Sequence, residues 1–167
     1  MSDALKEKTI SWCTDEGIFK EKIADKKASF HFIINFPKGS PYNMEVVQPK
    51  GRDDLIVIVW GIGVGEEHLE KIKSLKEKDK ELFLWEMRYL LGGRLTEVAL
   101  HHPDNILQKF VISSPLYADG LNKNIFMSTL GEIFKSGLLG IWKIQEKFGV
   151  PKKPTLSTTT PPVELYR

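Results

Sequence analysis

Apolar and polar residues alternate in the first third of the chain. Between residues 30 and 36, phenylalanine or isoleucine stands at every second position, and the alternation resumes at Tyr42, Met44 and Val46. The connection between the two stretches is rich in proline and glycine. Alternation with a period of two is typical of strands with one buried face. Because a connection this short joins antiparallel neighbours, the pattern predicts an antiparallel strand pair.

Residues 55–62 follow a second turn and are apolar on both faces of the expected strand. A strand of this kind is covered on both sides, by helices or by a partner subunit. A short helix over residues 3–13 and a short strand over residues 18–24 precede the alternating stretches. The first half therefore predicts a helix followed by an antiparallel meander.

The second half is mainly helical in pattern. Residues 66–91 have a helical composition with a break near 76–79, and residues 82–91 are apolar nearly all round, which predicts burial on more than one side. A hairpin follows, with its turn at residues 103–105, and a last helix is expected over residues 122–148.

Together the elements predict the α+β class, in the order helix, antiparallel β-meander, helix, β-hairpin, long helix. Residues 1–149 are expected to form a single domain. Residues 150–167 are rich in proline and threonine, and are expected to form an extended arm or a disordered end. The apolar residues Val163 and Leu165 stand apart there. We therefore expect this tail to add little to the stability of the domain, unless it is a docked arm.

The distribution of charged and apolar residues limits the kinds of partner that the protein is expected to bind. The net charge is +2 and lysines alternate with glutamates, whereas a binder of duplex nucleic acid has a clustered basic face. A weak nucleic-acid contact through the lysines of residues 71–80 stays open as an alternative. The N-terminus does not resemble a secretory signal, and no stretch has the length of a membrane span. We expect a cytoplasmic protein without a membrane or specific nucleic-acid partner. Lysine and glutamate dominate the charges over arginine, a bias of heat-adapted proteins.

A glycine-rich stretch, Gly61 to Gly65, lies between an expected strand and an expected helix. A dinucleotide fingerprint needs its third glycine where this chain has Glu66. Glu66 and Glu67 also place negative charge where a pyrophosphate would bind. We interpret the stretch as a tight turn before a helix and predict no nucleotide and no other cofactor.

The histidines are the other candidates for chemistry. His101 and His102 are adjacent on an expected strand, so their side chains point to opposite faces and cannot share a metal ion. A site would need His31, His68 or a carboxylate such as Asp53 from elsewhere in the fold. We predict no metal site, and keep a small enzyme or ligand binder at the sheet edge as the alternative. Cys13, the only cysteine, is interpreted as a small buried residue.

The last helix carries more apolar surface than packing against a single sheet would bury. It would be about 40 Å long, close to the diameter of the domain. One stripe faces the sheet, and Phe134, Leu138 and Trp142 form a second stripe. Gly137 and Gly140 lie near this second stripe and would permit close approach. We predict a homodimer through Phe134, Leu138 and Trp142. A monomer that buries both stripes is the alternative.

The alternating strands, the turn Gln-Pro-Lys-Gly-Arg at residues 48–52 and the apolar helix over residues 82–91 together resemble a known group. The chain is similar to an archaeal family of uncharacterised proteins whose fold is like that of YbjN-like proteins and type III secretion chaperones. This resemblance implies a two-layer α+β sandwich that dimerises and binds other polypeptides. The resulting hypothesis is a non-enzymatic, chaperone-like or protein-binding module that acts as a homodimer, with an unidentified protein partner.

Overall fold

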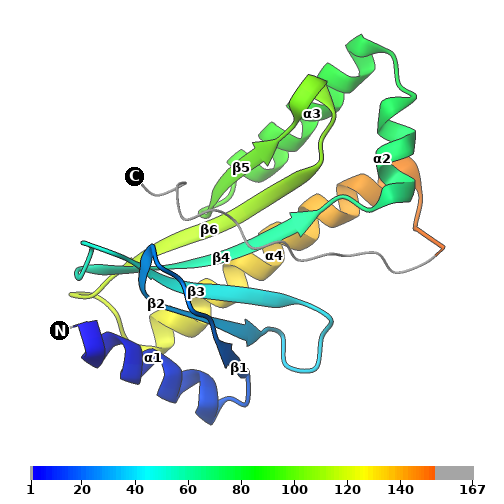
Figure 1. Ribbon diagram of the computed structural model, residues 1–167. Coiled ribbons are helices and arrows are strands. Elements are labelled where there is room, and N and C mark those ends of the chain that lie inside the picture. Colours follow the sequence, from blue (N-terminus) through cyan, green and yellow to red (C-terminus); the bar gives the residue numbers. More distant parts are fainter. Residues whose placement is uncertain (1, 153–167) are drawn as a thin grey trace.

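The helices and strands are those of a computed structural model, which describes residues 2–152 (Figure 1). The helices are α1 (Ser2–Asp15), α2 (Glu66–Lys73), α3 (Glu77–Gly92) and α4 (Lys123–Phe148), with a short 3₁₀ turn at Pro103–Asn105. The strands are β1 (Phe19–Lys22), β2 (Ala28–Asn35), β3 (Asn43–Pro49), β4 (Leu55–Gly63), β5 (Glu97–His101) and β6 (Lys109–Tyr117). The tail expected over residues 150–167 lies outside the described residues from position 153 onward.

All six strands belong to one sheet in the order β1-β2-β3-β4-β6-β5, and each neighbouring pair is antiparallel. The predicted α+β class and the predicted order of elements are confirmed. The sequence did not predict that β6 pairs with β4 along nine residues. This pairing joins the meander and the hairpin into a continuous sheet.

The helices cover one face of the sheet, which we call the first face. Figure 1 shows α4 running behind β4 and β6 along the whole sheet. The side chain of Asn122 accepts a hydrogen bond from the amide of Ile125 and so caps the start of α4. Alternate residues of the strands, including Phe32, Ile58 and Phe110, point into the apolar layer beneath the helices.

Gly137 and Gly140 allow α4 to lie close to the sheet. A Cβ atom at position 137 would overlap the ring of Trp60, and one at position 140 would lie 2.5 Å from Cε2 of Phe110. The expected close approach is therefore made to the sheet of the same chain. The prediction that these glycines serve the second stripe of the helix was wrong. The sequence pattern does not show that two aromatic rings of the sheet fill the space beside them.

The helix α1 packs beside the start of α4 on the same face. The ring centroids of Trp12 and Phe126 are 5.7 Å apart, and Nζ of Lys8 donates to the carbonyl of Leu121. Cys13 is buried here, as predicted, and burial raises the pKa of its thiol to about 12. A thiol with this pKa is inert as a nucleophile at neutral pH.

The helix α3 lies beside α4 and is buried on one side only. Its buried apolar residues are Phe83, Leu84, Met87 and Leu91. The expectation that residues 82–91 are buried on more than one side was wrong, because α3 lies at the end of the sheet (Figure 1) with no described element on its outer side. Three large apolar side chains remain exposed there: Leu82, Trp85 and Tyr89.

The opposite side of the sheet, which we call the second face, is lined by the alternate strand residues Val47, Val57, Val59, Val111 and Ser113. None of the described helices packs on it, because the helices all contribute to the apolar cluster of the first face. The second face nevertheless consists mainly of small apolar side chains. This apolar character agrees with the prediction that the strand over residues 55–62 is apolar on both of its faces.

Candidate functional site

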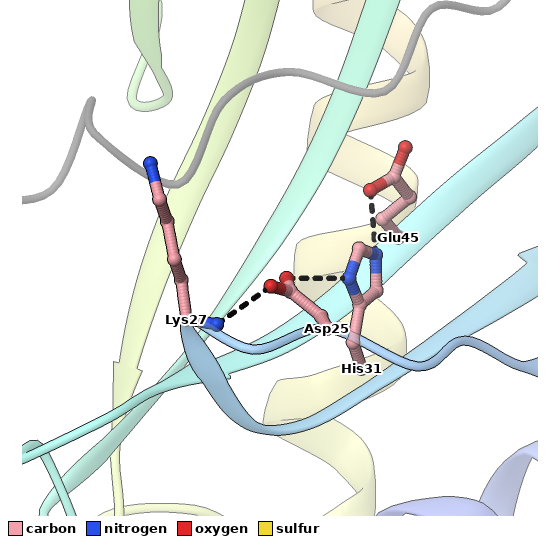
Figure 2. A network of polar contacts seen from close by, with 4 residues as sticks. All are labelled: Asp25, Lys27, His31 and Glu45. Carbon is pink, nitrogen blue, oxygen red and sulfur yellow. Dashed lines mark hydrogen bonds and ion pairs between the residues drawn. The ribbon is translucent and has the colours of Figure 1, made fainter.

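The second face carries one network of ionisable side chains, centred on His31 of β2 (Figure 2). Nδ1 of His31 lies 3.0 Å from Oδ2 of Asp25, and Nε2 lies 2.7 Å from Oε2 of Glu45 on β3. The other carboxylate oxygen of Asp25 accepts a hydrogen bond from the backbone amide of Lys27, 2.8 Å away. His31 and Glu45 are buried, so the network is closed to solvent on most sides.

The two carboxylates favour the charged form of the imidazole. Burial alone would lower the pKa of His31, but the hydrogen bonds and negative charges of Glu45 and Asp25 outweigh burial and raise it. Burial would raise the pKa of Asp25, but its hydrogen bonds to Lys27 and His31 and their positive charges lower it. Both ring nitrogens can donate to these carboxylates only when the ring is protonated, so the geometry favours an imidazolium between Asp25 and Glu45.

The geometry restricts what this network can do. Both ring nitrogens of His31 are bonded to carboxylates, so neither is available to take a proton from a substrate or to bind a metal ion. Among residues 2–152, no three histidine, cysteine, aspartate or glutamate side chains are arranged to hold a metal ion. We interpret the network as a buried ion-pair cluster that fixes β2 and its preceding turn against β3.

Replacing His31 with glutamine is expected to lower the melting temperature by several degrees at pH 5.5 and by less at pH 9. The folded-state pKa of His31 is raised, so its charged form stabilises the fold below the unfolded-state pKa of about 6.5, and this contribution is lost as pH rises through the folded-state pKa. The contribution from Asp25 is lost only as pH falls below about 4.

Thermal unfolding of the protein and of H31Q across this pH range measures the effect. H101Q is the matched control, because His101 is exposed at the other edge of the sheet. A difference in melting temperature that stays constant from pH 5.5 to pH 9 would contradict the charged state of His31.

The structure does not bring the other sequence candidates to His31. His102 follows β5, four strand positions from β2 in the sheet, which corresponds to about 19 Å. Its Nε2 lies 3.2 Å from Nη2 of Arg88. Asp53 lies in the exposed turn before β4. The hypothetical site that combines His31, His102 and Asp53 is therefore not formed.

The partners of His31 were not predicted from the sequence. Glu45 is paired with Ile33 in the antiparallel register, so it lies diagonally across from His31 on the same face. The signal in the sequence is that β2 and β3 each have an ionisable residue, His31 and Glu45, at a position that faces the otherwise apolar second face. That signal becomes specific only when the register is known.

A shallow groove between α3 and α4 exposes large apolar side chains. We call it the α3–α4 groove. Trp142 is 56% exposed and Tyr89 is 77% exposed, although both are large aromatic residues. The residues that line the groove are Glu86, Tyr89, Leu90, Leu139, Trp142, Lys143 and Glu146.

The three residues of the predicted interface differ in their surroundings. Phe134 packs against the sheet, with its ring centroid 5.9 Å from that of Trp60 and 6.1 Å from that of Phe36. Leu138 is half-buried against the apolar layer. Trp142 projects into the α3–α4 groove. The second stripe of α4 is therefore packed against the sheet at Phe134 and exposed at the surface at Trp142.

Within residues 2–152, none of the helices has the length and apolar character that a membrane crossing requires.

The architecture is that of an α+β protein with one antiparallel sheet and a helical layer, and comparisons identify the family. The family model described as "Uncharacterized conserved protein (DUF2299)" matches residues 5–144, and the chain belongs to this family. The predicted resemblance to a family of uncharacterised proteins is confirmed. No curated protein matches the sequence.

The chain is similar to solved structures, of which two are described here. An uncharacterized protein from Methanothermobacter thermautotrophicus is 30% identical, with a TM-score of 0.82, and the match covers 89% of this chain and 100% of the other. A structure described as the HopA1-SchA chaperone-effector complex is 7% identical, with a TM-score of 0.49, and the match covers 83% of this chain and 92% of the other.

Proposed function

We propose that this protein is a protein-binding, chaperone-like module that acts as a homodimer and has no catalytic role. The observation that carries the proposal is the α3–α4 groove, where Tyr89 and Trp142 present most of their surface to solvent. Exposed aromatic residues beside one another are typical of the central contacts in protein interfaces.

The rim of the groove supports contact between two copies. It carries both charges, because Glu86 lies 3.9 Å from Nζ of Lys143 and 3.3 Å from Nζ of Lys147, and Lys143 also pairs with Glu146. In a two-fold contact each copy presents the same surface to the other. A rim with both signs allows lysines of one copy to face glutamates of the other.

The alternative, a small enzyme or ligand binder, has less support. His31 has no ring nitrogen available for a substrate, and His102 lies near the opposite edge of the sheet, after β5. His68 also has a structural partner, since its Nε2 lies 2.7 Å from the carbonyl oxygen of Gly149. A catalytic site needs a polar group that is free to act on the substrate.

The oligomeric state tests the proposal. Light scattering at high micromolar concentration is expected to give the mass of two chains. The double variant Trp142→Glu with Tyr89→Glu is expected to give the mass of one chain, because four charges would be brought together in a two-fold contact. Leu138 is left unchanged in this test, since its half-buried side chain also packs against the apolar layer.

Leu95→Glu is the matched control, because Leu95 is 93% exposed and does not line the groove. It should retain the mass of two chains. Circular dichroism should be the same for all three proteins, since the replaced side chains lie at the surface. A mass of one chain for the unchanged protein would refute the homodimer, and a dimer in the double variant would refute the groove as its interface.

A further inference from the structure

A pocket lies where the end of β4, the helix α2 and the last turns of α4 come together (Figure 1). Its volume is about 210 Å³. The apolar side chains of its wall are Ile62, Val64, Ile141, Ile144, Val150 and Pro151. The pocket is on the helical side of the sheet and shares no residue with the α3–α4 groove.

The glycine-rich stretch at the end of β4 forms part of this wall. Gly63 and Gly65 line the pocket and contribute only backbone atoms to it. Among the described residues of the wall there is no lysine, arginine, aspartate or glutamate, so a charged ligand would be desolvated without an opposite charge beside it. Glu66 and Glu67, which begin α2, also oppose an anion. The pocket therefore suits an uncharged ligand.

The imidazole of His68, which lines the pocket, has one nitrogen available to a ligand. Its Nε2 lies 2.7 Å from the carbonyl oxygen of Gly149, so Nε2 carries a proton and donates it to that oxygen. In the neutral ring Nδ1 is then an acceptor. No donor among residues 2–152 is bonded to Nδ1. Gln145 adds an amide that can donate or accept.

The side of the pocket that follows α4 is fixed in place by α2. Besides the contact of His68, Nζ of Lys71 donates to the carbonyl of the last residue of α4, 2.7 Å away. The amide of Lys152 donates to Oε2 of Glu67, 3.3 Å away. These hydrogen bonds hold the wall before a ligand arrives, and a site formed in advance loses less conformational entropy on binding.

We propose that this pocket binds a small uncharged molecule that has an apolar ring and one hydroxyl or N–H group. An apolar cavity of about 150 Å³ holds benzene, so this pocket has room for one substituted ring. The ring would contact the isoleucines and Val64, and its hydroxyl or N–H group would donate to Nδ1 of His68. The described wall has no second ionisable side chain to exchange a proton with, so the proposed role is binding without catalysis.

Titration with p-cresol tests the proposal, and p-xylene is the matched ligand because a methyl group replaces its hydroxyl. We expect p-cresol to bind the full chain with a Kd below about 1 mM, within the range for a ligand of this size. Nuclear magnetic resonance of the backbone amides locates the site. The largest shifts are expected at Gly63, Gly65 and His68.

The variant H68Q tests the acceptor. The amide nitrogen of glutamine keeps a donor for the carbonyl of Gly149, but Nδ1 is lost. The Kd of p-cresol is expected to rise about tenfold, which is the effect of one hydrogen bond in a buried site, whereas that of p-xylene should not change. H101Q is the control and should bind both ligands as the unchanged protein does. Ile144→Phe should fill the pocket and abolish binding of both, with the melting temperature as the check of folding.

Four results would overturn the proposal. They are no binding of p-cresol up to about 10 mM, amide shifts away from the pocket, an equal loss of p-cresol and p-xylene affinity in H68Q, and tighter binding of N-acetyl-tyrosinamide than of p-cresol. The last result would assign the pocket to a tyrosine side chain of a partner polypeptide. The double variant of Trp142 and Tyr89 should still bind p-cresol, so failure of the homodimer and failure of this site are distinguishable.

Discussion

Replacing Gly137 with alanine is expected to lower the free energy of unfolding by about 2–3 kcal/mol, despite the higher helix propensity of alanine. The new methyl group would overlap the ring of Trp60 and lie 2.9 Å from Cδ1 of Ile62. Trp60 has no room to move away, because it is 1% exposed and its ring is packed between Tyr42 and Phe134. Either α4 moves away from the sheet or the aromatic packing is distorted.

Two other glycines of α4 provide a matched series. Gly140→Ala should also destabilise, because its methyl group would lie 2.5 Å from the ring of Phe110. Gly131→Ala should stabilise by about 0.8–1 kcal/mol, because nothing lies within 4 Å of the added group and alanine is the better helix former. Urea unfolding followed by circular dichroism measures all three. Equal stability of G137A and G131A would contradict the close packing of α4 on the sheet.

Replacing Phe126 with alanine is expected to lower the free energy of unfolding by about 3–5 kcal/mol. The side chain is 0% exposed and its ring lies 5.7 Å from that of Trp12. Its removal leaves a cavity between the first and last helices that neither helix can close alone. The ion pair of Lys123 with Glu16 at 2.6 Å lies nearby at the surface and contributes little.

Hydrogen exchange would show where the loss is concentrated. The amides of α1 are expected to exchange faster than those of β4 in F126A, because Phe126 packs directly against Trp12 of α1. The adjacent residue offers a control: Ile125 is 42% exposed, so Ile125→Ala should change stability by much less. Uniformly faster exchange across the sheet would contradict a local role for Phe126.

The sequence predicted elements whose pattern depends on one buried face. The alternation over residues 30–36 corresponds to β2, and the last helix, expected over residues 122–148, is α4. The break expected near residues 76–79 corresponds to the separation of α2 from α3. The pairing of β6 with β4 could not be predicted, because strand partners far apart in the sequence are chosen by tertiary packing.

The candidate surfaces were predicted less well. Apolar content alone does not distinguish buried from exposed residues of α3, and Tyr89 is exposed while its neighbour Met87 is buried. Phe134 could not be assigned to the sheet without the rings of Phe36 and Trp60 in place. For His31, only the register of β2 and β3 identifies Glu45 as its partner.

The two outer strands of the sheet affect how the protein behaves in concentrated solution. An unpaired strand edge is a template for adding strands from other molecules, and this leads to fibrils. One edge is β1, which has only four residues, carries charges from Lys20 to Lys22, and has an irregular register beside Phe19. The other edge is β5, five residues that begin at Glu97 and end at His101. Short, charged edges of this kind resist the addition of strands from other molecules, so we expect the sheet not to extend from one molecule into the next.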